Sequence, residues 1–153
     1  MTQTITCSPG FDFSLFNSTQ FKLIFTKIPN VEFWCQRVTL PEVTYNSVTQ
    51  DTPSLDLFHT GEKMHFTPFS CSVLLDKNLI TYKEIFNWMS TDSSSNQVNT
   101  SFSDASLFLG DVEVKFRDLF PIEISKLDFS IIATDIQPMT FNISFRYDWY
   151  YFA

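Results

Sequence analysis

The stretch "GEKMHFTPFSCSVLLDKNLITYKEIFNWM" (residues 61–89) contains two hydrophobic periods, one after the other. In its first half apolar and polar residues alternate, which is the period of a half-buried strand. Met64 and Phe66 form one alternating set, and the set that begins at Phe69 has the opposite parity. Pro68 stands between the two sets, so the sequence predicts a bulge or kink within one long strand.

The second half of the same stretch has the period of an amphipathic helix. Its apolar residues recur at spacings of three and four, with Ile85 beside the stripe formed by Leu79, Tyr82, Phe86 and Met89. Asp76 or Asn78 is placed to cap the first turn. We therefore expect one helix over about residues 78–90, directly after the strand.

The closing stretch "MTFNISFRYDWYYFA" (residues 139–153) alternates strictly and predicts a final strand. We expect the apolar set to lie in the core, against the helix that carries Trp88; it consists of Phe141, Ile143, Phe145, Tyr147, Trp149 and Tyr151. Tyr150 and Phe152 place aromatic rings on the polar parity as well. The end of the chain is thus apolar on both faces, which favours contact with a second subunit there.

The rest of the chain reads as short strands separated by turns. A hairpin is expected from the alternation in residues 21–27 and 31–40, and further strands are expected at 105–109, 112–116 and 127–131. Residues 43–60 indicate an exposed hairpin or long loop, and residues 90–103 indicate a polar loop. The predicted fold class is α+β, mainly β: an antiparallel β-sandwich or barrel of about seven or eight strands with one flanking helix.

Length and composition suit a single domain that is partly covered by other subunits. The 153 residues divide into an N-terminal leader (1–19) and one β domain (20–153). The chain is 44% hydrophobic and only 18% charged, against ~25% charged residues in an average soluble protein. Its net charge of −7 disfavours docking on nucleic acid or on an anionic membrane.

Several classes of site are absent from the sequence. The three glycines lie far apart and cannot form a phosphate-binding loop, and the three cysteines have no CxxC spacing. His59 and His65 are not arranged as metal ligands. No signal peptide or transmembrane helix is apparent. We therefore predict no catalytic residue, no cofactor, no metal and no membrane association.

Two other classes of function are compatible with the sequence. An exposed platform of aromatic rings at Trp149 or Tyr150 is the feature that a carbohydrate-binding β-sandwich module requires. An enzyme with two scattered carboxylates is the other alternative, since 17 acidic residues offer many pairs, although the sequence singles out none.

Five motifs in order then resemble a known family. They are "RVTLPEV" (37–43), the stretch 61–89 with Trp88 at its helix end, a polar loop, "VKFRDLFPIEISKLDFS" (114–130) and "MTFNISFRYDWYYF" (139–152). This order is similar to that of the tail tube proteins of contractile-tailed bacteriophages, over roughly residues 20–152. The junction at Asp76, where the strand leads into the helix, and Trp88 at the helix end correspond most closely to the motifs of that family.

The resemblance implies a structural virion protein whose hexameric rings stack into the inner tail tube through which DNA passes. A tube-initiator or adaptor ring of the baseplate, with the same fold, is the alternative. Tail sheath and baseplate or neck proteins would be partners, in a virion made in the host cytoplasm. Subunit contacts are expected at the leader, residues 43–61 and residues 90–103; the interface residues are Tyr45, Phe58, His59, Tyr150 and Phe152. Glu113 and Asp148 are expected to face a lumen that repels phosphates.

Overall fold

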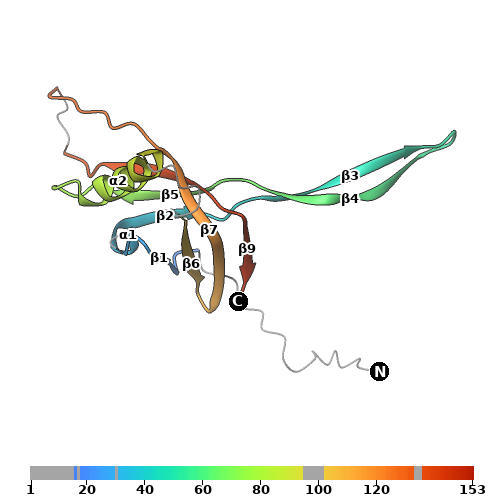
Figure 1. The fold of residues 1–153 in the computed structure, drawn as a ribbon, viewed down its shortest axis with the longest axis horizontal. Helices are drawn as coiled ribbons and strands as arrows, with labels where there is room; N and C mark the ends of the chain where they lie inside the picture. Colours follow the sequence, from blue (N-terminus) through green and yellow to red (C-terminus); the bar gives the residue numbers. More distant parts are fainter. Residues whose placement is uncertain (1–15, 17, 30, 95–101, 133–135) are drawn as a thin grey trace, which may run out of the picture.

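The structure is a computed structural model that describes residues 16, 18–29, 31–94, 102–132 and 136–153. Within these residues the chain forms strands and two helices (Figure 1). The strands are β1 Phe21–Phe25, β2 Cys35–Thr39, β3 Val43–Asp51, β4 Asp56–Phe66, β5 Phe69–Leu74, β6 Ser103–Leu109, β7 Val112–Ile124, β8 Thr140–Arg146 and β9 Trp149–Phe152; the helices are α1 Val31–Trp34 and α2 Ile80–Ser94. All strand pairs among them are antiparallel, which confirms the predicted fold class.

Seven strands form the main sheet, in the order β1-β6-β7-β8-β5-β2, with β9 beside β7. β7 is long enough to pair with β6 and β9 through its first half and with β8 through its second half. The two terminal strands, β1 and β2, border one groove together with β6. The main sheet therefore curls toward a barrel that stays open between β1 and β2. Among the described strands, β3 and β4 pair only with each other, in a separate sheet.

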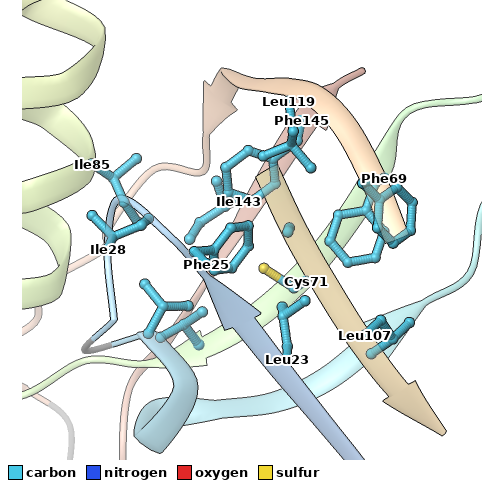
Figure 2. Packing of buried hydrophobic residues seen from close by; sticks show 14 of the residues in the cluster. Leu23, Phe25, Ile28, Phe69, Cys71, Ile85, Leu107, Leu119, Ile143 and Phe145 are labelled. Carbon is cyan, nitrogen blue, oxygen red and sulfur yellow. The ribbon is translucent and has the colours of Figure 1, made fainter. Parts of the chain in front are cut away.

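The core lies inside this curled sheet, and α2 covers one side of it. Its largest fully buried side chains are aromatic: Phe25, Phe69, Phe116, Phe141 and Phe145. Phe145 touches three others, with ring centroids 5.0 Å from Phe25, 6.2 Å from Phe69 and 6.3 Å from Trp88. Figure 2 shows Ile85 of α2 next to Ile28, above Phe25. Burial of these rings is the main stabilising term of the body.

Helix α2 begins where the sequence predicted a cap. The Ile80 N–H donates to Asp76 Oδ2 at 3.1 Å, so Asp76 satisfies one of the free amides of the first turn. The helix ends at Ser94, four residues later than predicted, within the expected polar loop. Ile85 and Trp88 are buried, whereas Phe86 is 56% exposed. The predicted stripe was therefore wrong at Phe86, because the buried face runs through Ile85 and Trp88.

The predicted hairpin of residues 21–27 and 31–40 is wrong. β1 pairs with β6 and β2 pairs with β5. Between them α1 makes one helical turn, in which the Val31 N–H donates to the Ile28 carbonyl at 3.4 Å. Val31 and Cys35 are four residues apart, so their spacing fits a helical turn as well as a strand. Local alternation did not distinguish the two.

The break at Thr67 and Pro68 is larger than the predicted kink. β4 ends at Phe66 in the two-stranded sheet, and β5 begins at Phe69 in the main sheet. The Thr67 N–H donates to the Glu42 carbonyl at 3.1 Å, which closes the base of the two-stranded sheet. Proline has no N–H to donate, so the ladder cannot continue through Pro68. The expected single strand is two strands in two sheets.

The final strand keeps its predicted inward parity only as far as Tyr147. Trp149 is 48% exposed, whereas Tyr150 packs against the core. The same inversion occurs opposite, in β7, where Phe116 and Leu119 are both buried and Asp118 between them has a φ of 53°. A bulge in β7 thus changes the inward face of both strands at one point. The expectation that Trp149 and Tyr151 lie in the core was wrong.

The strand predicted at residues 127–131 is also wrong. β7 ends at Ile124, and the chain then leaves the sheet. Phe129 is 73% exposed and Ile131 is fully exposed, so the apolar alternation of this segment has no sheet to lie on within the described chain.

Candidate assembly surfaces

The two-stranded sheet of β3 and β4, which we call the arm (residues 43–66), projects from the body (Figure 1). This confirms a hairpin in the region where the sequence left hairpin or loop open. All nine residues of β3 are exposed. Large apolar side chains nevertheless lie exposed along it: Val43, Tyr45, Val48, Leu55, Leu57, Phe58 and Met64. An isolated two-stranded hairpin is marginally stable in water, and an exposed apolar surface of this kind marks a contact site.

A bulge in the middle of the arm depends on Gly61. Tyr45 pairs with Met64 and Ser47 pairs with Thr60, so one residue of β3 faces three of β4. Gly61 lies against the backbone of Asn46, where a Cβ atom would be 2.8 Å from the Asn46 carbonyl carbon. Only glycine allows this approach. The arm is therefore a shaped element with a defined bend.

The tip of the arm is acidic. Asp51 and Asp56 face each other directly across the last pair of the ladder. Like charges in that position are destabilising. The turn beyond them is held by reciprocal hydrogen bonds between Thr52 and Leu55. A basic surface on a partner would relieve the repulsion at the tip.

The structure places the five predicted interface residues in two groups. Tyr45, Phe58 and His59 lie on the arm, and His59 Nε2 is 3.0 Å from Gln50 Oε1. Tyr150 and Phe152 lie on β9, in the body. The Tyr150 hydroxyl donates to the Pro41 carbonyl at 3.3 Å, just before the arm begins. Tyr150 is thus partly a packing residue at the root of the arm, whereas Phe152 is 62% exposed.

The two predicted lumen acids do not form an acidic patch. Glu113 lies on β7 with Lys115 Nζ 3.7 Å from its Oε1. Arg117 follows on the same outward parity of β7. Asp148 lies at the inversion point of the last strand, where its N–H donates to the Arg117 carbonyl at 3.1 Å. A basic side chain therefore accompanies Glu113 directly, and the backbone of Asp148 contacts the backbone of Arg117.

A polar hollow, which sequence analysis did not single out, lies on the outer face of β2, β5, β8 and the end of β7. It has a volume of about 400 Å³, and its lining is mostly small and polar: Arg37, Thr39, Ser70, Cys71, Ser72, Glu123, Ser125, Asn142 and Ser144. The sequence does show a polar side at residues 70–72 and at residues 142–144. These residues form one surface because β5 and β8 are neighbouring strands, which the sequence alone did not reveal.

Among the described residues, no cluster of three or more His, Cys, Asp or Glu could hold a metal. A hydrogen bond with Cys71 lowers the pKa of the Cys35 thiol, and the same contact, together with burial, raises the pKa of Cys71. The two cysteines lie on the neighbouring strands β2 and β5. None of the helices described is long and apolar enough to cross a membrane. The expected contacts at the leader lie outside the described residues, apart from residues 16, 18 and 19.

Comparison with family models and with curated protein sequences finds no match. Solved structures do match over most of the chain. A chain from the baseplate of the anti-feeding prophage is 12% identical, with a TM-score of 0.70, over 92% of this chain and 96% of that chain. A chain from the sheath/tube terminator of the extracellular contractile injection system PVC, in the extended state, is 14% identical, with a TM-score of 0.68, over 92% and 97%.

A chain from the sheath–tube complex of the PVC injection system, also in the extended state, is 12% identical, with a TM-score of 0.62, over 91% of each chain. At these identities the similarity is one of fold. All three matches come from baseplate, terminator or sheath–tube assemblies of contractile systems. The chain therefore has the contractile tail tube-type fold that its sequence motifs predicted.

Proposed function

We propose that this chain is a structural, non-enzymatic subunit of a contractile tail, and that it forms hexameric rings which stack into the inner tube. The observation that carries the proposal is the arm: an extended hairpin with exposed apolar side chains and an acidic tip, on a body of tube-type fold. Contact with a neighbouring subunit would bury these side chains. Closure into a ring also removes the free sheet edges that promote aggregation in a monomer.

The proposed partners are further copies of this chain, the tail sheath, and baseplate or neck proteins, in a virion assembled in the host cytoplasm. DNA would pass through the lumen without specific binding. Glu113 and Asp148 remain the proposed lumen acids, and the net charge of −7 supports a surface that repels phosphate. The polar hollow is a further candidate for the lumen side, because its lining is mostly hydroxyl and amide groups and its one cation, Arg37, is accompanied by Glu123.

A ring at the baseplate or at the tube terminus is the second candidate. The baseplate and terminator chains have TM-scores of 0.70 and 0.68, against 0.62 for the sheath–tube chain. Such a ring would occur once per particle, whereas tube rings recur along the tail. Quantitative mass spectrometry of purified particles distinguishes them: a copy number close to that of the sheath supports the tube, and a single ring supports the alternative.

Assembly of the purified chain, alone and with its tail partners, tests the proposal itself. We expect rings or tubes by electron microscopy, and their loss when Phe58 is changed to Asp on the arm. Phe86→Asp is the matched control, since Phe86 is similarly exposed but lies on α2. A chain that remains monomeric at high concentration with every tail partner present would refute the assembly function. Binding to a glycan array would instead favour a carbohydrate module that uses the exposed Trp149 and the ring of Tyr151 beside it.

A further inference from the structure

Residues 126–132, which we call the connecting segment, carry a strand pattern that the subunit itself does not use. Leu127, Phe129 and Ile131 alternate with Lys126, Asp128 and Ser130. The ladder between β7 and β8 reaches only as far as Ser125, whose N–H donates to the Asn142 carbonyl at 2.8 Å. The segment then leaves the sheet. The sequence of the segment therefore has the alternation of a strand, although the segment forms no strand within one subunit.

Three large apolar side chains of the segment are exposed next to one another, whereas exposed apolar residues on a surface usually occur singly. Phe129 is 73% exposed, Ile132 is 90% exposed and Ile131 is fully exposed, while Leu127 packs against the core and anchors one end. The Ile132 N–H donates to Ser130 Oγ at 3.3 Å, a local contact that forms no ladder. Asp128 pairs with Lys126 at 3.6 Å with both side chains more than four-fifths exposed, so this ion pair is weak. Contiguous apolar side chains of this kind indicate a partner surface.

The body offers a surface of matching chemistry at β2. This strand ends the main sheet and pairs with β5 along one side. Beyond it lies a groove of about 540 Å³ with an apolar floor made by Phe21, Val38, Leu40, Leu107 and Leu109; Phe16, Ser18 and Gln36 line it as well. Arg37 lines both this groove and the polar hollow, so it lies at the edge between them.

The other terminal strand, β1, is less open. Helix α1 packs beside it, and Lys22 Nζ of β1 lies 2.6 Å from Glu32 Oε1 of α1. Among the described residues, β2 has β5 as its strand partner on one side and the groove, which Phe16 and Ser18 also line, on the other.

We propose that residues 126–132 of one copy add as a strand to the β2 edge of a second copy. The two parities of the segment match the two faces of that edge. Phe129 and Ile131 cover the apolar groove, while Asp128 lies on the polar side beside Arg37. Main-chain hydrogen bonds to the edge of β2 that has no strand partner among the described residues supply the binding free energy, and the side chains set the register. The inference rests on the proposed ring, which supplies the second copy.

Charge reversal tests the predicted contact between copies. Asp128→Arg and Arg37→Asp should each weaken assembly of the full chain, and the double variant should restore it. Asp111→Arg, an exposed acid at the turn between β6 and β7, is the matched control and should assemble normally. The double variant Phe129→Ser with Ile131→Ser should fold with an unchanged Tm, because both side chains are already exposed. Its half-assembly concentration should rise about 30-fold, the effect of losing one strong contact at an interface.

A photoreactive benzoylphenylalanine in place of Phe129 identifies the occupant directly. In assembled particles we expect its crosslinks on residues 35–40 of another copy. Crosslinks to a sheath or baseplate protein would overturn the inference, and so would normal assembly of the Phe129 and Ile131 double variant. In both cases rings still form and the proposed function stands. If the wild-type chain forms no ring with its partners while it remains folded, the proposed function and the inference fail together.

Discussion

Replacing Gly61 by Ala tests whether the bend of the arm is built into its backbone. The added Cβ would lie 2.8 Å from both the carbonyl carbon and the Cβ of Asn46. Two carbon atoms need about 3.5 Å, and the Asn46 carbonyl oxygen would lie closer still, so β3 and β4 must separate there by at least about 0.7 Å. The pairs Tyr45–Met64 and Ser47–Thr60 flank this point. Losing two backbone hydrogen bonds costs about 1–3 kcal/mol, which is comparable to the whole stability of an isolated hairpin.

Amide hydrogen exchange, followed peptide by peptide, measures this effect. We expect Gly61→Ala to lower the protection of residues 43–66 and to impair ring formation, while the Tm of the body stays unchanged. The body should be insensitive because only Phe66 of the arm packs against its core. Ser47→Ala is the control, since Ser47 is exposed beside the bulge. Unchanged protection of the arm would refute the reasoning about the close approach, and a body that melts together with the arm would refute their independence.

Two further predictions concern the body. Phe145→Ala removes a fully buried ring that contacts Phe25, Phe69 and Trp88. It should lower the free energy of unfolding by about 3–5 kcal/mol in urea titrations. The control Phe86→Ala should cost less than about 1 kcal/mol, and similar losses for both variants would contradict the assigned core. Burial, assisted by the charge of Tyr150, raises the pKa of Tyr147 from 10.0 to about 12, so its contribution to stability is complete below pH 10 and disappears as the pH rises through 12. In Tyr147→Phe, the free energy of unfolding should therefore fall less steeply between pH 10 and pH 12. Identical pH profiles for the variant and the wild type would show that Tyr147 is not the group responsible.

Some of the fold was readable because it depends on local period and local chemistry. The change from alternation to a spacing of three and four located α2, and Asp76 was correctly predicted as its cap candidate. The strands expected at 105–109 and 112–116 leave a turn between them, where Gly110 adopts a φ of 60° that favours glycine. In each case residues that are close together in the sequence determine the local structure, without contacts from elsewhere in the chain. Hence the fold class and one long helix were predicted, and an exposed hairpin was one of the two alternatives for residues 43–60.

The arm and its residues were partly predictable for the same reason. Tyr45, Phe58 and His59 lie in a stretch whose mixed polar and apolar residues suit exposure. Their distribution along a projecting hairpin depends on the bulge at Gly61, which needs a close approach by Asn46 from the other strand. The polar hollow likewise required knowing that β5 and β8 are neighbours.

The sequence by itself determined which residues are apolar and with what period, and therefore which elements form. Only the tertiary structure decided which strands are neighbours: β1 pairs with β6, far along the chain, and not with β2. It also decided the inversion after Tyr147, because the bulge at Asp118 in β7 changes the inward face of the opposite strand. Residues 127–131 show the physical reason. Alternation in the sequence predicts that a strand has an apolar side. Which surface covers that side depends on the elements that lie next to the strand in space.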